Sequence, residues 1–353
     1  MAYLVLSNGC VFEGKRIGAA ADRVGELVFT TGMEGYLETL TDPSYYGQIV
    51  TQTFPMIGNY GLIEEDFEGR SALAGYIVRE LCPTPSNFRS ASPLNDYLTA
   101  RGIPGLSGVD TREIVRITRE EGVMNAMICD TIPEDLSALR DFAVTNAVAS
   151  VTSAEPGFHP AAGEARHRVA LIDYGAKRNI LRSLLARGCD VTVWPAATPA
   201  ETILGTDPDG IMLSNGPGDP KEAAGCVAEI RKMIGKKPLF GICLGHQLTA
   251  LALGGDTMKL KYGHRGGNQP VRDTGSGRVY ITSQNHGYAV IADTLRDVGR
   301  EAFLNANDGS NEGMVYPGLN CFTVQFHPEA AAGPRDTAFL FDRFIAAMEK
   351  GGR

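Results

Sequence analysis

In the second half of the chain, short apolar runs alternate with longer segments in which apolar residues recur at helical spacing. The runs at 169–172, 191–194 and 210–214 have the length and continuous hydrophobicity of strands that are buried on both faces. The segments 177–187 and 221–235 each place their apolar residues on one face of a helix. Alternating strands and helices are typical of a parallel sheet covered on both sides, so we expect an α/β domain in this region.

The pattern changes on both sides of this region. Beyond residue 270 it becomes strand-like and rich in loops, and it ends in an apolar strand at 321–326 and a helix at about 335–349. The first part of the chain contains short alternating strands among turn signals, with helical patterns near 92–101 and 110–121. The strands expected there are 3–6, 26–30, 47–51 and 73–78. This mixture predicts a separate α+β module.

A change of composition separates the two parts. Residues 153–167 are rich in Pro, Gly and Ala and have no hydrophobic periodicity, which is typical of a linker. We therefore expect an N-terminal domain at 1–152, a linker at 153–167 and a second domain at 168–353. Two domains also agree with a length of 353 residues.

Composition and charge argue against several classes of function. The formal net charge is −8 and no run of Lys or Arg forms a basic stripe, so nucleic-acid binding is not expected. The N-terminus lacks the features of a signal or transit peptide, and no stretch approaches the roughly 20 apolar residues of a membrane span. The seven cysteines form no C-x-x-C pair, which argues against a disulfide framework or zinc site and predicts a cytoplasmic protein.

The most informative segment is 238–247, in which a short apolar strand turns at Cys243 directly into a helix. Gly241 and Gly245 flank the cysteine, which gives the G-x-C-x-G form of a nucleophile elbow. Such a tight turn needs neighbours without side chains. We expect the turn to leave the sulfur exposed at a helix N-terminus, where unpaired N–H groups and the helix dipole favour the thiolate. Cys243 is therefore the candidate nucleophile rather than a structural cysteine.

A cysteine nucleophile needs a base, and His327 has the best position among the six histidines. It directly follows an apolar strand, at the edge of an open α/β sheet where ligand chemistry gathers. Pro328 fixes a turn after it, so Glu329 can fold back on the imidazole and set its tautomer. His246, on the helix after the elbow, is expected to point along that helix. The sequence thus predicts a triad of Cys243, His327 and Glu329.

The loop 214–220, with sequence Ser-Asn-Gly-Pro-Gly-Asp-Pro, ends another predicted strand. Its glycines expose backbone N–H groups that can converge on an anion. The N–H groups of Gly216 and Leu244 would together form an oxyanion hole for acyl transfer. An ordinary Pro-Gly turn is the alternative. The loop lacks the G-K-[ST] of a phosphate-binding P-loop, and the chain has no recognisable ATP site.

The elbow, the 214–220 loop and the His-Pro-Glu segment together resemble the motifs of the class I (triad) glutamine amidotransferases. Further segments are similar to the small-chain family of the carbamoyl-phosphate synthases, and the similarity runs nearly end to end. Those segments are 35–45, 261–268 and 283–289. The resemblance implies that Cys243 attacks the side-chain amide of glutamine, that ammonia leaves, and that water hydrolyses the glutamyl thioester. It also implies that ammonia passes through a tunnel to a large partner chain.

The same resemblance implies the remaining properties. The large chain uses bicarbonate and two ATP to make carbamoyl phosphate for arginine and pyrimidine biosynthesis, so this chain holds no cofactor and no metal, while ATP and Mg²⁺ serve the large subunit. The implied assembly is a heterodimer or a larger assembly of heterodimers, without nucleic acid or membrane. The implied fold is a swivelling β/β/α-like α+β domain followed by a mostly parallel-sheet class I glutamine amidotransferase domain. Residues implied to contact glutamine are Ser44, Gly216, Gly218, Leu244, Gln247, Asn285, Gly287 and Tyr288.

Two of these contacts need comment. Phe is expected at position 288 as readily as Tyr, so the hydroxyl of Tyr288 is expected to have no essential role. Ser44 follows Asp42-Pro43 and has the alternative role of capping a turn. Three other functions remain open at this point. They are a glutaminase for another synthase, such as those of anthranilate or GMP, a cysteine hydrolase or peptidase, and a regulatory subunit without catalysis.

Overall fold

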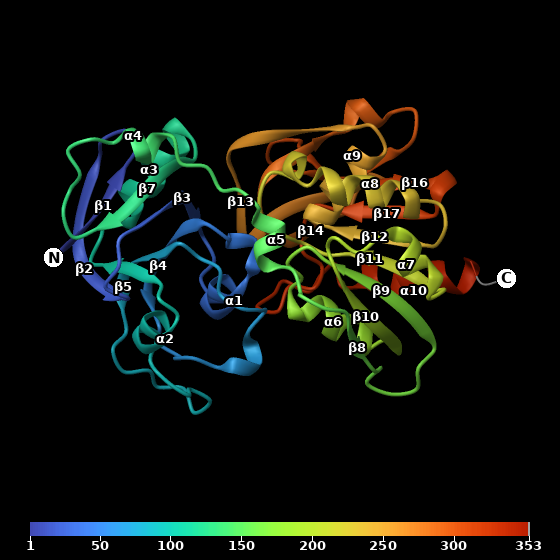
Figure 1. The fold of residues 1–353 in the computed structure, drawn as a ribbon, viewed down its shortest axis with the longest axis horizontal. Helices are drawn as coiled ribbons and strands as arrows, with labels where there is room; N and C mark the ends of the chain where they lie inside the picture. Colours follow the sequence, from blue (N-terminus) through green and yellow to red (C-terminus); the bar gives the residue numbers. More distant parts are fainter. Residues whose placement is uncertain (352–353) are drawn as a thin grey trace. The chain divides into compact units, whose positions relative to one another are not determined.

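The computed structural model describes residues 1–351 and divides into two compact units, Met1–Thr145 and Asn146–Arg353 (Figure 1). The expected linker, 153–167, lies inside the second unit. Within it, β8 (Gly157–His159) pairs antiparallel with β10 (Cys189–Pro195) at the edge of the sheet. A three-residue strand is too short to give a periodic pattern, which is why the Pro- and Gly-rich composition predicted a linker instead.

The first unit consists mainly of short strands with a few helices. In chain order its elements are β1 (Ala2–Leu6), β2 (Val11–Gly18), β3 (Arg23–Thr30), α1 (Tyr36–Thr41), η1 (Pro43–Tyr45), β4 (Gln48–Ile57), η2 (Glu64–Asp66), β5 (Gly75–Leu81), α2 (Leu94–Ala100), β6 (Pro104–Ser107), α3 (Thr111–Glu121), β7 (Met124–Cys129) and α4 (Ser137–Arg140). Within residues 1–145 the strands close into a barrel in the order β1-β2-β6-β5-β4-β3-β7. The expected α+β character of this region is confirmed.

Successive apolar residues of the barrel strands β3 and β4 pack in two different core clusters, so both faces of these strands are apolar. Leu27 and Ile49 belong to a core cluster that includes Ile114 of α3, whereas the next residues, Val28 and Val50, pack in a second cluster with α1 and α2. Side chains on successive strand residues point to opposite faces, so the barrel uses both its faces for packing. α3 begins at an Asp110 cap, whose side chain accepts from two backbone N–H groups of its first turn.

The second unit alternates strands and helices and then continues in long antiparallel strands. Besides β8 and β10, its elements are α5 (Ala147–Val151), β9 (His167–Asp173), α6 (Arg178–Leu185), α7 (Ala200–Gly205), β11 (Gly210–Leu213), η3 (Pro220–Glu222), α8 (Ala224–Met233), β12 (Leu239–Ile242), α9 (Leu244–Ala252), β13 (Asp256–Asp273), β14 (Val279–Ile291), η4 (Ala292–Leu295), β15 (Arg300–Asn305), β16 (Asn311–Tyr316), η5 (Pro317–Leu319), β17 (Cys321–Val324) and α10 (Phe339–Gly351).

Within residues 146–351 the strands form one ten-stranded sheet in the order β14-β13-β15-β16-β17-β12-β11-β9-β10-β8. The central strands β17, β12, β11, β9 and β10 run parallel, as the alternating pattern predicts. Antiparallel strands extend the sheet on both sides. The α/β class is confirmed, and the site described below lies where the parallel strands end.

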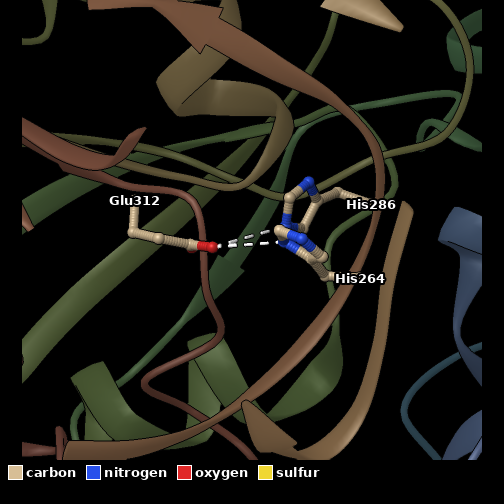
Figure 2. Close-up of side chains that lie close together, drawn as sticks. All are labelled: His264, His286 and Glu312. Carbon is tan, nitrogen blue, oxygen red and sulfur yellow. Dashed lines mark ion pairs between the residues drawn. The ribbon is translucent and has the colours of Figure 1, made fainter. Parts of the chain in front are cut away.

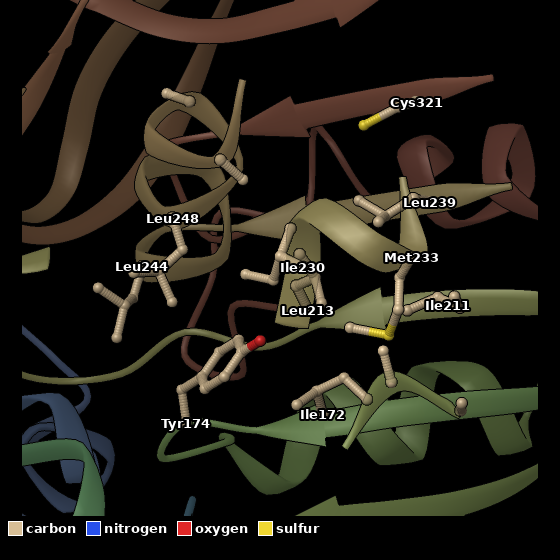
Figure 3. Close-up of a cluster of buried hydrophobic side chains, with 14 of the residues drawn as sticks. Ile172, Tyr174, Ile211, Leu213, Ile230, Met233, Leu239, Leu244, Leu248 and Cys321 are labelled. Carbon is tan, nitrogen blue, oxygen red and sulfur yellow. The ribbon is translucent and has the colours of Figure 1, made fainter. Parts of the chain in front are cut away.

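Helices cover both faces of the parallel strands (Figure 1). One core cluster joins Ile172 and Leu213 of the sheet to α7, α8 and α9, and Figure 3 shows Ile230 of α8 and Leu248 of α9 among its members. The neighbouring strand residues, such as Leu171, pack with α6 and α10 in a second cluster. Burial on both faces explains why these strands read as continuous apolar runs.

Candidate active site

The turn at Cys243 has the geometry of a nucleophile elbow. Cys243 joins β12 to α9 with φ of 52° and ψ of −102°, a region that non-glycine residues rarely adopt. A Cβ added at Gly241 would lie 2.8 Å from the carbonyl oxygen of Gly245, and one added at Gly245 would lie 2.6 Å from that of Leu213. Both flanking glycines are therefore required by close backbone approach, as the sequence predicts.

The sulfur of Cys243 lies at the start of α9, but the prediction that it is exposed is wrong. The residue is 2% exposed. The Nε2 group of Gln325 donates to Sγ at 3.6 Å, and Sγ lies 3.7 Å from the backbone oxygen of Asn285. The segment after β17 and strand β14 thus cover the elbow, and periodicity along the chain does not reveal contacts between such distant segments.

His327 and Glu329 form a buried pair at the same edge of the sheet. His327 Nδ1 lies 2.7 Å from Glu329 Oε1, and both side chains are inaccessible to solvent. Because β17 runs beside β12 and Val324 accepts the Cys243 N–H at 2.8 Å, the nucleophile and His327 leave neighbouring strands together. Among the described residues, His327 Nε2 is buried and has no hydrogen-bond partner. It is thus the ring nitrogen that is left for proton transfer.

Glu329 also contacts a cation that sequence reasoning missed. The Nζ atom of Lys177 lies 3.5 Å from Glu329 Oε1, and the side-chain amide of Asn179 donates to the Glu329 backbone oxygen. Burial opposes ionisation of Glu329, but the attraction of His327 and Lys177 outweighs it and lowers the pKa of the carboxyl to about 2. The carboxylate is therefore ionised at neutral pH. A signal for Lys177 did exist, since it follows β9 at the same edge of the sheet.

The 214–220 loop is held by hydrogen bonds from its polar side chains. Ser214 Oγ accepts from the Tyr174 N–H at 2.9 Å, and Asn215 Oδ1 accepts from the Lys177 N–H at 2.9 Å. A Cβ at Gly216 would lie 2.3 Å from the Tyr174 oxygen and 2.8 Å from a Leu244 side-chain carbon. The loop thus lies against the start of α9, where only glycine fits. Gly216 and Leu244 as oxyanion donors stay a prediction.

Several residues implied to contact glutamine lie beside the elbow. Asn285 and Tyr288 are on β14, as is Gly287, and Gln247 Nε2 of α9 donates to the Tyr288 oxygen at 2.9 Å. The same Nε2 lies 3.0 Å from Oε1 of Gln325, a residue that the sequence did not single out. Gly218 has φ of +91°, which favours glycine. Contact of these residues with glutamine is a prediction.

Two polar residues need separate placement. Ser44 belongs to the first unit, where it is buried in η1 and its N–H donates to Asp42 Oδ1 at 2.9 Å. Asp42, rather than Ser44, is the capping side chain of this turn, and a role of Ser44 toward glutamine stays a prediction. His246 Nδ1 lies 2.8 Å from the Thr323 hydroxyl, so the ring is bonded away from the sulfur. Burial lowers the pKa of His246 to about 3, which keeps it neutral.

A second cluster of titratable residues lies in the antiparallel part of the sheet. His264 of β13, His286 of β14 and Glu312 of β16 bring one candidate ligand atom each to within 4.8 Å of the others (Figure 2). All three residues are buried. The sequence places His264 in one of the segments that carry the family resemblance, and that resemblance implies no metal in this chain.

The chain matches two protein families. Residues 170–347 match Glutamine amidotransferase class-I, the class that the elbow and the buried His–Glu pair define. Residues 4–128 match Carbamoyl-phosphate synthase small chain, CPSase domain. None of the helices within residues 1–351 is long and apolar enough to cross a membrane.

Full-length relatives agree with both matches. The chain is 50% identical to a carbamoyl phosphate synthase small chain of Syntrophotalea carbinolica, over 99% of this chain and 98% of the relative. It is 49% identical to those of Clostridium perfringens, over 98% of both chains, and Bacillus caldolyticus, over 98% and 96%. The chain therefore belongs to the carbamoyl-phosphate synthase small-chain family. The match at 4–128 argues against a glutaminase of another synthase.

Proposed function

We propose that this chain is the glutamine-hydrolysing subunit of a carbamoyl-phosphate synthase and that Cys243, His327 and Glu329 carry the reaction. Family membership supports the overall activity. The observation that carries the residue assignment is the buried 2.7 Å contact between His327 Nδ1 and Glu329 Oε1, on the strand next to a cysteine at a nucleophile elbow.

The first half of the reaction forms a thioester. His327 Nε2 takes the thiol proton, and Cys243 Sγ attacks the side-chain carbonyl carbon of glutamine. The negative charge that develops on the carbonyl oxygen is met by the N–H groups of Gly216 and Leu244. The tetrahedral intermediate collapses, the C–N bond breaks, and His327 returns its proton to the leaving nitrogen as ammonia forms. Glu329, ionised beside Lys177, holds the Nδ1–H and stabilises the imidazolium.

The second half regenerates the enzyme. His327 Nε2 now removes a proton from water, whose oxygen attacks the thioester carbonyl carbon, and the same N–H groups hold the oxyanion. The C–S bond breaks, glutamate leaves, and the proton returns from His327 to the sulfur. One glutamine and one water thus give one glutamate, one ammonia and the proton that the new γ-carboxyl group releases.

Backbone and amide groups would hold the substrate. We assign Gln247, Asn285, Gly287 and Tyr288 beside the elbow, with Gly218 on the neighbouring loop, to the glutamine end that carries the α-amino and carboxyl groups. Hydrogen-bond donors and acceptors of fixed position suit such a zwitterion. Ser44, which belongs to the first unit, is the remaining member of the predicted set.

Ammonia then passes to a large partner chain, in a heterodimer or a larger assembly of heterodimers. The partner combines ammonia with bicarbonate and ATP, using Mg²⁺, and the carbamoyl phosphate serves arginine and pyrimidine biosynthesis. This chain needs no cofactor of its own. We also propose a cytoplasmic location, which the seven free cysteines support. Affinity capture from a native extract should recover the large chain, and recovery of this chain alone would contradict the partnership.

The test of the proposed function uses the complete complex and two cysteine variants. Cys243→Ser should abolish carbamoyl phosphate formation from glutamine but leave formation from added ammonium salts. Cys226→Ser is the matched control, because Cys226 is half-buried on α8 in the same unit, with its Sγ 3.6 Å from the Ala196 oxygen. This control should keep both activities. Loss of both activities in Cys243→Ser, or of neither, would overturn the proposal.

A further inference from the structure

A buried carboxylate, Glu312 of β16, contacts residues of β13, β14 and β15 in the antiparallel part of the sheet. Its Oε1 atom lies 3.3 Å from His264 Nδ1, 4.0 Å from His286 Nε2 and 3.0 Å from the donating Asn305 Nδ2. Figure 2 shows the carboxylate facing both imidazoles from one side. The second ring nitrogen of His264, Nε2, lies 2.9 Å from Asp308 Oδ2. His264 therefore stands between two carboxylates.

His286 connects this pair to the segment 284–288 of β14. The rings of His264 and His286 meet edge to face, with centroids 4.9 Å apart. His286 Nδ1 lies 2.8 Å from the Tyr288 oxygen and its Nε2 lies 3.1 Å from Gln284 Oε1. Both ring nitrogens of His286 thus lie against the ends of a segment whose middle residues, Asn285 and Gly287, are proposed glutamine contacts. The neutral ring has one N–H and donates it to one of these two oxygens.

Two chains of hydrogen bonds connect Glu312 to the surroundings of Cys243. Its backbone oxygen accepts from the Gln325 N–H at 2.9 Å, and the Gln325 side chain donates to Cys243 Sγ. Its side chain acts through the two histidines on the Tyr288 oxygen, which also accepts from Gln247 Nε2. The cysteine therefore lies between two segments that are both attached to one buried residue.

We propose that Glu312 and His264 are positioning residues for glutamine: their ion pair fixes the 284–288 segment of β14, through His286, in the conformation that binds the substrate. The inference rests on the proposed function, because it takes this segment as the glutamine contact. Neither side chain touches the reacting atoms. The expected consequence is a change in KM for glutamine rather than in kcat.

The charges around His264 fit an imidazolium. Burial disfavours the charged ring, but the hydrogen bond and charge of Glu312, together with Asp308, outweigh burial and raise the pKa of His264. His286 faces it from β14 and stays neutral, because burial and the His264 charge lower its pKa well below the ordinary value. Arg265, next on β13, adds to that lowering. The protonation of the His264–Glu312 pair thus depends mainly on three charges: the carboxylates of Glu312 and Asp308 and the imidazolium of His264.

Glu312 itself needs the imidazolium. Burial raises the pKa of its carboxyl, and the hydrogen bonds from His264 and Asn305 act against that rise. Within the described part of the chain its Oε2 atom has no hydrogen-bond partner of ordinary geometry, although the Gln284 amide lies close enough to lower the pKa. A buried carboxylate without a counter-charge is costly, so removal of the proton from His264 would weaken the contact.

The first variant is Glu312→Gln in the reconstituted complex. It keeps the size of the side chain, removes the charge, and should raise KM for glutamine about tenfold or more, because small displacements of positioning groups have effects of this order. The kcat at saturating glutamine and the ammonia-dependent synthesis should change little. Glu301→Gln is the matched control, since Glu301 Oε2 accepts from Asn311 Nδ2 at 2.9 Å on the adjoining strand. Its KM should equal that of the wild type.

The pH dependence separates positioning from packing. In the wild type, KM should rise as the pH passes through the raised pKa of His264 and the imidazolium loses its proton. In Glu312→Gln that pKa falls, so the rise in KM should begin at lower pH. A variant that only loosens the packing would leave the pH dependence of KM unchanged. Asp308→Asn acts on the same ring from a half-exposed position, so it should shift KM and the profile less, in the same direction, and keeps the test possible if Glu312→Gln does not fold.

Three outcomes would overturn the inference. The first is an unchanged KM in both variants while the wild type hydrolyses glutamine, which leaves the proposed function intact. The second is an unshifted pH profile. The third is one equivalent of zinc or another transition metal in the purified complex that is lost in Glu312→Gln, because the three atoms would then be metal ligands rather than an ion pair. A wild type without glutaminase activity would instead contradict the proposed function itself.

Discussion

The sheet of the second unit contains two buried imidazole–carboxylate pairs with opposite electrostatics. In the pair at the end of the parallel strands, His327 and Glu329 are 2.7 Å apart and Lys177 supplies a further cation 3.5 Å from the carboxylate. In the pair among the antiparallel strands, Glu312 has His264 at 3.3 Å and the uncharged Asn305 at 3.0 Å. The pKa of Glu329 falls to about 2, whereas burial raises that of Glu312.

The difference indicates what each histidine can do. His327 and Lys177 both lower the pKa of Glu329, so the carboxylate keeps one counter-charge when His327 is neutral, as the proposed proton transfer by His327 requires. For Glu312 the balancing cation is His264 itself, whose raised pKa favours the protonated ring. A histidine whose charge is needed for structure is a poor base, whereas one whose partner is balanced independently is free to act. A further charge, that of Asp308, reinforces the imidazolium of His264.

The comparison predicts its largest effect for His327→Asn. Loss of the ring that transfers protons should lower kcat for glutamine hydrolysis by about 10²–10⁴-fold. The matched change His264→Asn should raise KM and leave most of kcat. Steady-state kinetics of both complexes measures this difference. Equal losses of kcat in the two variants would contradict the proposal that His327 is the base and that His264 is a positioning residue.

A smaller effect is expected for Lys177→Met, which removes the cation beside Glu329 while keeping an apolar stem. The pKa of Glu329 should then rise, because burial acts on the carboxyl with less opposition. Glutaminase kcat/KM should fall roughly tenfold, which corresponds to about 1.4 kcal/mol of lost stabilisation. The acid limb of its pH profile should move to higher pH. An unmoved acid limb would show that Lys177 does not set the charge of Glu329.

Acid unfolding should separate the two carboxylates. The folded-state pKa of Glu329 is depressed from 4.5 to about 2, so its stabilisation is complete above pH 4.5 and is lost as the pH falls toward 2. Glu329→Gln should lack this part of the acid sensitivity. Glu312→Gln should retain it, because burial raises the pKa of Glu312 instead. Chemical denaturation of both variants between pH 5 and about pH 2 measures the two slopes. Identical slopes would contradict the difference in electrostatics.

The smallest effect is expected for Tyr288→Phe, in the 284–288 segment that is proposed to bind glutamine. The proposed contact of Tyr288 uses its backbone, whose oxygen accepts from Gln247 and lies against His286. Removal of the hydroxyl should leave KM and kcat unchanged within error in the glutaminase assay. A large rise in KM would show that the side chain itself binds the substrate.

The sequence predicts the local parts of the site well. Gly241, Cys243 and Gly245 define the elbow through their spacing alone, and the order strand–His327–Pro328–Glu329 predicts a contact between residues two positions apart. The strands and helices around them follow from continuous apolar runs and helical periodicity. These features depend on neighbours in the chain, which a pattern can express.

The remaining parts depend on contacts between distant segments. Lys177 and Gln325 are placed at Glu329 and Cys243 by the order of the strands, and burial of the sulfur follows from the position of β14. The long β13–β14 hairpin was anticipated only in part because its polar, glycine-rich strands give weak alternation. β8 gave no signal because a three-residue edge strand is stabilised by its partner β10.

The central claim is that Cys243 is the one activated thiol of this chain. It can be tested by treating the complex with a glutamine-mimicking electrophile, with and without excess glutamine, and mapping the adduct by peptide mass spectrometry. Cys10, Cys82 and Cys226 are half-buried rather than fully buried, so these three thiols are the ones that can compete for the reagent. We predict one equivalent of label on Cys243, protection by glutamine, and no labelling in His327→Asn at the same reagent concentration. Glutamine-protected labelling of any other cysteine would contradict the assignment.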